Sequence, residues 1–215
     1  MSYVNANDII NIINLLNNNE IDYMLLRNID NKIPYNLKIL SDIDILVNKS
    51  CINKVESLLI SNGFYENKNH CVNDIYLYGV DKYRQFIKEN VLLDFQFQLV
   101  ARSLDAGQWI PLDQKIQDST FKNKRFEKRD NDFEYWTLSY NDEFIALIAR
   151  SIFDKREFQA GYIDRIEEIK TKIDEEDVLE KLELVFFKYT PYLFEQINNS
   201  LYENIIQNYL QFKEY

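Results

Sequence analysis

Two aspartates stand one residue apart in the otherwise apolar segment "ILSDIDILV" of residues 39–47. Because successive side chains of a β-strand point to opposite faces, Asp42 and Asp44 would share one face, and Ile43 and Ile45 the other. Carboxylates gathered on one face repel each other and are costly to bury. In an acidic chain the same pattern also occurs on a solvated strand face, so a third ligand is needed to indicate a site.

A second alternating segment, "VLLDFQFQLV", follows at residues 91–100 and contains Asp94. The expected apolar face of this strand consists of Phe95, Phe97 and Leu99. If the two strands are neighbours, three aspartates converge on one side of a sheet. Carboxylate ligands of this kind select Mg²⁺ or Mn²⁺, and two such ions about 4 Å apart can activate an attacking oxygen and stabilise a leaving phosphate. The pattern therefore predicts a metal-dependent phosphoryl- or nucleotidyl-transfer site built from Asp42, Asp44 and Asp94.

The elements expected to position these residues are short helices and strands. Apolar residues at helical spacing predict helices, and short alternating or apolar runs predict strands. In chain order we expect a helix over 8–16 capped by Asn7, strands over 21–28 and 37–47, a helix over 51–62 capped by Ser50 and ended by Gly63, and strands over 74–80, 82–88 and 91–100. The polar "KEN" between the last two strands suits a hairpin turn.

The rear of the chain has a different pattern. One or two short strands are expected within residues 108–139, and from Ser139 onward the apolar spacing is helical. The expected helical segments are 141–155, 158–173, 175–189 and 201–212. The fold class is therefore α+β, with strands and helices together over residues 1–137, followed by a helical domain over 138–215.

Composition excludes several other functions. The chain of 215 residues has a net charge of −10 and no block of Lys or Arg, which argues against long DNA or RNA as a substrate. Its isolated glycines form no dinucleotide-binding or P-loop motif, and its single histidine, His70, and two cysteines, Cys51 and Cys71, offer no zinc-ligand spacing. Without a signal-peptide pattern or an apolar run long enough to span a bilayer, we expect a cytoplasmic protein.

A strand ending in "YMLLRN", then "SDIDILV", a helix ending in "NGF" and a later "LLDF" together resemble the DNA polymerase beta-like nucleotidyltransferase superfamily. The first two motifs are similar to those of a bacterial group of uncharacterised nucleotidyltransferase-like proteins, in which LRN or LRG precedes DIDILV. The resemblance covers about residues 20–100 and continues weakly over 139–166. It implies a mixed β-sheet with flanking helices, in which Asp42 and Asp44 bridge the metals. It also implies that Asp94 ligates the catalytic metal and accepts the proton of an acceptor hydroxyl.

The resemblance also implies a nucleoside triphosphate as donor, with Mg²⁺ or Mn²⁺, and a rear helical domain that closes one side of the cleft. One departure is that Arg27-Asn28 stands where most of the superfamily has a Gly-Ser or Gly-Gly turn around the triphosphate. Arg27 either clamps phosphate or pairs with an aspartate, and the alternative is that the chain no longer uses nucleoside triphosphates. Ser41 is expected to bond a phosphate oxygen or to start its strand. Lys155 either reaches the phosphates or complements the end of its helix.

The expected function is transfer of a nucleotidyl or related phosphoryl-type group to a hydroxyl of a small-molecule, carbohydrate or protein acceptor. Similar proteins suggest surface-polysaccharide assembly as one context. Two alternatives stay open on the sequence: a minimal nucleotidyltransferase of the toxin–antitoxin type that acts on a partner protein, and a binding module that keeps the fold without turnover. Tyr76, Tyr78, Tyr83 and Arg84 are candidates to face the acceptor, although strand alternation alone gives half of them that direction.

Overall fold

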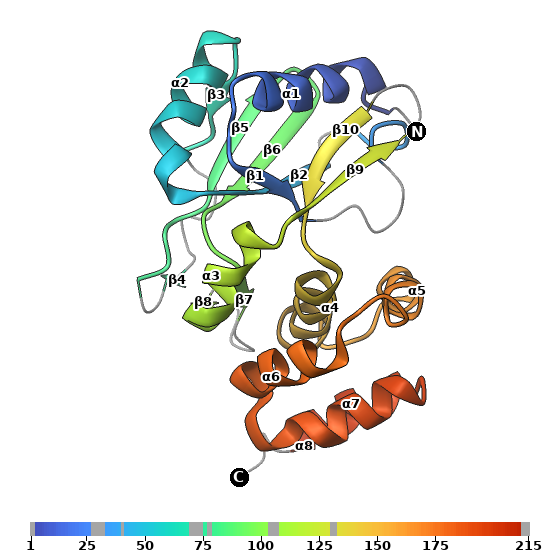
Figure 1. Ribbon diagram of the computed structural model, residues 1–215. Coiled ribbons are helices and arrows are strands. Elements are labelled where there is room, and N and C mark those ends of the chain that lie inside the picture. The colour runs from blue at the N-terminus through green and yellow to red at the C-terminus, as the bar shows by residue number, and fades with distance from the viewer. Residues whose placement is uncertain are drawn as a thin grey trace.

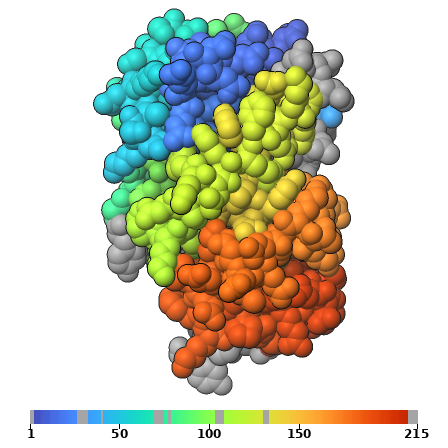
Figure 2. Space-filling model, in the orientation of Figure 1, coloured from blue at the N-terminus to red at the C-terminus, as the bar shows by residue number. Residues whose placement is uncertain are grey.

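A computed structural model describes residues 3–26, 33–39, 41–68, 75–76, 79–102, 108–129 and 133–211 of the chain. It is a mixed α+β fold in which a twisted sheet with two helices on one side stands above a group of helices (Figure 1). In the space-filling view, the helical half of the chain, residues 140–211, lies against the sheet half that precedes it along a broad and continuous border (Figure 2). The expected fold class is therefore confirmed.

Most of the helices lie in the rear of the chain. The helices are α1 (Ala6–Asn18), the 3₁₀ turn η1 (Lys49–Cys51), α2 (Ile52–Ser61), α3 (Gln114–Lys122), α4 (Tyr140–Ala149), the π-helical segment η3 (Arg150–Lys155), α5 (Ala160–Ile169), α6 (Glu175–Phe186), the 3₁₀ turn η4 (Phe187–Tyr189), α7 (Thr190–Asn198) and α8 (Tyr202–Gln211). The strands are β1 (Tyr23–Leu25), β2 (Asp42–Val47), β3 (Tyr65–Glu66), β4 (Ile75–Tyr76), β5 (Arg84–Lys88), β6 (Val91–Gln96), β7 (Val100–Arg102), β8 (Gln108–Pro111), β9 (Arg125–Arg129) and β10 (Phe133–Thr137).

The large sheet has the strand order β3-β5-β6-β2-β1-β10-β9, and a small sheet has the order β4-β8-β7. In the large sheet, β2 runs parallel to β6 and antiparallel to β1, so the sheet is mixed. The β5–β6 pair is a hairpin in which Lys88 lies opposite Val91, with Glu89 at a positive φ of 51° in the turn. The predicted hairpin is therefore confirmed, and β2 and β6 are neighbours at the centre of the sheet.

Two hydrophobic cores lie on the two faces of the large sheet. The first packs α1 and α2 against a face that includes Ile43, Ile45 and Val47 of β2. The second includes Met24 and Leu46 from the opposite face and joins them to the helices from α4 to α8. Burying each aliphatic side chain of this kind contributes roughly 1.5–3 kcal/mol. Parts of the front half, among them α3, also contribute to the second core, and the division of the chain into domains near residue 138 stays a prediction.

The predicted helix caps are each displaced by two residues. The side chain of Asn5, rather than that of Asn7, caps α1, because Asn5 Oδ1 accepts a hydrogen bond from the backbone N of Asn7 at 3.0 Å. In the same way Asn48 Oδ1 accepts from the backbone N of Ser50 at 3.1 Å and starts η1, and α2 follows without a side-chain cap. Both helical segments begin two residues earlier than predicted, at Ala6 and Lys49, so the capping residue that precedes each of them is displaced by the same two residues. Gly63, at φ +85°, follows the end of α2 as expected.

Several predicted strands are longer than the observed ones. Residues 21–28 and 37–47 yield only β1 and β2 among the described residues, and residues 91–100 divide into β6 and β7 of different sheets. The chain bends after Gln96, so Phe97 stays in the first core while Leu99 enters the second, and the prediction of one apolar face for both was wrong. Helix α3, within residues 108–139, was not predicted.

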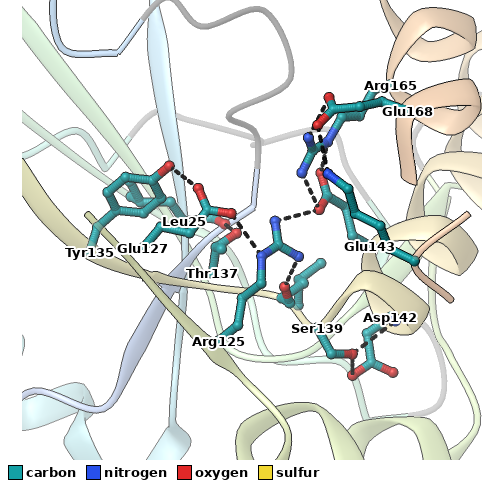
Figure 3. Close-up of polar contacts among 12 residues, drawn as sticks. Leu25, Arg125, Glu127, Tyr135, Thr137, Ser139, Asp142, Glu143, Arg165 and Glu168 are labelled. Carbon is teal, nitrogen blue, oxygen red and sulfur yellow. Dashed lines mark hydrogen bonds and ion pairs between the residues drawn. The ribbon is translucent and has the colours of Figure 1, made fainter. Parts of the chain in front are cut away.

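An ion-pair network around the buried Glu143 joins β9 to α4 and α5 (Figure 3). Glu143 of α4 accepts hydrogen bonds from Arg125 Nη2 at 2.7 Å and from Arg165 Nε and Nη2 at 2.7 and 2.9 Å. Burial works to lower the pKa of Arg165, but its bonds to Glu143 and Glu168 outweigh this effect and raise the pKa above its ordinary value. Arg125 also donates to Glu127 and to the carbonyl of Leu138. The network therefore holds the edge of the sheet to the helical half.

Among the helices of the described ranges, none combines the length and the apolar character that a bilayer crossing requires.

Candidate metal centre

The pairing of β2 with β6 brings three carboxylates to one face of the sheet. The two strands are parallel and in register, so that Asp44 lies directly beside Asp94, and Asp42 lies beside Leu92. Side chains at matched positions of neighbouring strands point to the same face, and Asp42 and Asp44 share that face because they are two residues apart. The opposite face of β2 is buried against α1 and α2, as the alternation predicts.

One carboxylate oxygen from each of Asp42, Asp44 and Asp94 lies within 4.8 Å of the other two. Asp44 and Asp94 are buried, with 4% and 6% of their surfaces exposed, whereas Asp42 is exposed at the start of β2. A set of three oxygen donors at this separation suits a hard divalent cation such as Mg²⁺ or Mn²⁺, whose charge would offset the repulsion between the carboxylates. The open side at Asp42 would give a ligand access to the ion.

Two neutral side chains contact the buried aspartates. Gln85 of β5 donates from Nε2 to Asp94 Oδ1 at 2.7 Å. The hydroxyl of Tyr83 lies 3.5 Å from Asp44 Oδ1, and Gln96 donates a short hydrogen bond to that hydroxyl. These contacts orient both carboxylates without adding a positive charge of their own.

The small sheet places Trp109 beside Tyr83 and Arg102 beside Trp109. The ring of Trp109 on β8 lies 5.3 Å from that of Tyr83, and the guanidinium of Arg102 on β7 lies 5.3 Å from the centre of the Trp109 ring. Of the side chains expected to face an acceptor, Tyr83 does lie at the carboxylates. Arg84 points to the other face and pairs with Glu56 of α2 at 2.6 Å. Its neighbour Gln85 takes the site face instead, because the strand alternates.

The remaining predicted site residues are distributed as follows. Arg27 and Asn28, the candidate phosphate-binding pair, lie outside the described residues, as do His70, Cys71 and Tyr78. Ser41 is half-buried and immediately precedes β2, where its backbone N donates to the carbonyl of Lys38 at 3.0 Å. Lys155 ends η3 in the helical half and pairs with Asp154 at 3.8 Å. The structure therefore brings together Asp42, Asp44 and Asp94, and the binding roles of Ser41 and Lys155 stay predictions.

Gln85, Asn67, Trp109 and Arg102 were missed as neighbours of the site. A signal for Gln85 exists in the sequence, because a two-residue turn at Glu89 and Asn90 sets Lys88 opposite Val91 and, three pairs further, Gln85 opposite Asp94. The other three residues belong to strand β7 or β8 or follow β3, and their approach depends on tertiary packing rather than on local pattern.

No protein-family model matches the sequence, and the comparison with curated proteins finds no match. Among solved structures, the fold is similar to that in "Solution Structure of Antibiotic-Resistance Factor ANT(2'')-Ia Reveals Substrate-Regulated Conformation Dynamics". The two chains superimpose with a TM-score of 0.51 and 11% sequence identity over 90% of this chain and 97% of that chain. The likeness to that solved structure extends over nearly the whole length of this chain and supports the mixed α+β fold.

Proposed function

We propose that this protein is a metal-dependent nucleotidyltransferase that transfers a nucleotidyl group from a nucleoside triphosphate to a hydroxyl of a small-molecule, carbohydrate or protein acceptor. The observation that carries the proposal is the meeting of the Asp42, Asp44 and Asp94 carboxylates within 4.8 Å. This meeting occurs in a fold similar to that of a nucleotidyltransferase.

Asp42 and Asp44 would hold Mg²⁺ or Mn²⁺, and Asp94 would complete the set of ligands. When bound, the cations would offset the phosphate charge and lower the pKa of the attacking hydroxyl. Asp94 is buried beside Gln85 and is suited to accept the hydroxyl proton as the acceptor oxygen bonds to the α-phosphorus. The bond from that phosphorus to the bridging oxygen breaks, and pyrophosphate leaves with the electron pair. Arg27 and Lys155 are proposed to balance phosphate charge.

The acceptor is proposed to be small, or a protein side chain, because a chain with a net charge of −10 would repel a long nucleic acid. We further propose that residues 1–137 form the catalytic domain in the cytoplasm and that the helical domain, residues 138–215, closes one side of the cleft. Surface-polysaccharide assembly is the proposed context. The alternative of a binding module without turnover is favoured by one feature, the Arg27-Asn28 pair in place of a glycine turn.

Isothermal titration tests the proposal. The wild-type chain, Asp42→Asn and Asp44→Asn are titrated with a panel of nucleoside triphosphates, with Mg²⁺ or Mn²⁺ present or chelated. Asp164→Asn is the matched control, because Asp164 is an exposed residue of α5 and undergoes the same chemical change. We expect metal-dependent nucleotide binding that both site variants lose and the control keeps. Nucleotide binding that ignores both the metal and the site substitutions would favour the binding module.

A further inference from the structure

We propose that Gln85 is a positioning residue that holds Asp94 in the orientation needed for cation binding, and that Asn67 fixes the amide of Gln85. The inference rests on the proposed function and adds two residues to its site. It assigns a role to two amides, the buried Gln85 and the half-buried Asn67, that the transfer reaction itself does not use.

The sheet register places Gln85 against Asp94. The two residues are direct partners on the antiparallel strands β5 and β6, so their side chains share one face. Gln85 is 7% exposed and Asp94 6%, and Gln85 Nε2 lies 2.7 Å from Asp94 Oδ1. A buried bond of this length restricts rotation of the carboxylate about its side-chain torsions.

Hydrogen-bond chemistry fixes which way the side-chain amide of Gln85 faces. An ionised carboxylate only accepts, so the NH₂ group of Gln85 must face Asp94 and its carbonyl oxygen must face the other way. Gln85 Oε1 there accepts from Asn67 Nδ2 at 2.6 Å, and the backbone N of Asn67 donates to the carbonyl of Gln85 at 2.8 Å. Asn67 follows directly on β3, the neighbour of β5. Because Asn67 is held by both main chain and side chain, it keeps the Gln85 amide from turning over.

A neutral donor suits this position better than a cation would. An arginine or lysine against Asp94 would compete with a divalent ion for the same negative charge, whereas an amide orients the carboxylate and leaves its charge in place. Strand alternation enforces this choice, since the adjacent Arg84 points to the opposite face and pairs there with Glu56 at 2.6 Å. The structure thus keeps the strand's positive charge on the face away from the three carboxylates.

The test uses the full chain and Mn²⁺ alone. Gln85→Met keeps the bulk of the side chain and removes the donor, while Gln196→Met is the matched control. Gln196 of α7 is likewise buried, at 8% exposure, and its Oε1 accepts from Asn204 Nδ2 at 3.2 Å in the helical half. Mn²⁺ affinity is measured by electron paramagnetic resonance. Thermal unfolding without metal shows whether each variant keeps its fold. We expect Gln85→Met to weaken Mn²⁺ binding roughly 10- to 100-fold and Gln196→Met to leave it unchanged.

A double-mutant cycle separates positioning from a general loss of structure. Asn67→Ala is expected to weaken Mn²⁺ binding less than Gln85→Met does, and to add nothing in the Gln85→Met background, because Asn67 acts through Gln85. Asn67→Ala also tests the positioning of Asp94 through Gln85 if Gln85→Met does not fold. Wild-type Mn²⁺ binding with no change in either variant would overturn the inference alone. Absence of Mn²⁺ binding to the wild type would overturn the proposed function together with it.

Discussion

Replacement of Glu143 by glutamine should weaken the junction between the sheet and the helical half more than any change at an exposed ion pair. The Glu143 side chain is 6% exposed and accepts from Arg125 and Arg165, whose side chains are 17% and 15% exposed. Glutamine has the same shape but lacks the charge, and its NH₂ group would face an arginine donor. The substitution therefore leaves guanidinium groups of the junction without their shared anion.

The size of the effect follows from these contacts. Removing one partner of a buried ion pair costs about 3–5 kcal/mol. Both arginines keep other acceptors, since Arg125 still donates to Glu127 and Arg165 to Glu168, which favours the lower end of that range. We expect the free energy of unfolding to fall by about 3 kcal/mol.

Urea unfolding monitored by far-ultraviolet circular dichroism and by tryptophan fluorescence measures this loss. Coincidence of the two transitions checks that the chain unfolds as one unit. Glu168→Gln is the control, because Glu168 binds the same Arg165 but its side chain is 53% exposed, and exposed pairs contribute about 0.2–1 kcal/mol. A Glu143→Gln loss below about 1 kcal/mol, or an equal loss in Glu168→Gln, would refute the role assigned to the buried network.

Three further predictions concern the site, a turn and an ion pair. Mn²⁺ at about a hundred times its dissociation constant should stabilise the wild type by about 2.7 kcal/mol and raise Tm by roughly 5–10 °C, and Asp44→Asn or a chelator should abolish this shift in a thermal-unfolding scan. Gly63→Ala should cost about 1–2 kcal/mol through its φ of +85°, because among the described residues an added Cβ meets only the end of the Lys88 side chain, Cε at 3.7 Å and Nζ at 3.9 Å, in ordinary contact. Gly63→Asn, which tolerates this conformation better, should cost less in the same urea assay. Burial works to raise the pKa of Glu127, but hydrogen bonds from Tyr135 and Arg125 outweigh it and lower the pKa below 4.5. Its contribution is therefore present above pH 4.5 and is lost as the pH falls through the lowered value, so the stability gap between wild type and Glu127→Gln should shrink as the pH is lowered below 4.5. A gap that stays constant would contradict the assignment.

The sequence was informative where one local rule decides the structure. Alternation along β2 correctly assigned Ile43 and Ile45 to the core and Asp42 and Asp44 to the opposite face, and the polar turn after Lys88 correctly indicated a hairpin. Neither rule states which strands are neighbours, so the pattern predicted the meeting of Asp94 with the other two aspartates only on the condition that their strands pair, as β2 and β6 do.

Other features depend on packing that a local pattern does not contain. Helix α3 was missed because its only fully buried apolar side chain is Ile116, and it is stabilised instead by the cap of Asp113, whose side chain accepts from the backbone N of Lys115. The predicted single apolar face of residues 91–100 failed because the chain bends at 97–98 and carries Leu99 to a second core. The Asn67–Gln85 contact joins residues 18 positions apart and requires the sheet to be formed.

The face of β2 that carries Asp42 and Asp44 continues to Leu46, which is fully buried among the rear helices together with Met24. Side chains two positions apart on a strand are about 7 Å from each other, so the candidate metal centre borders directly on that core. A shortened chain that stopped before α4 would leave Leu46 and Met24 uncovered beside the carboxylates. Such a fragment would expose a hydrophobic patch next to the candidate metal centre and would tend to self-associate. Biochemical work on the isolated sheet half would therefore not report on the intact centre.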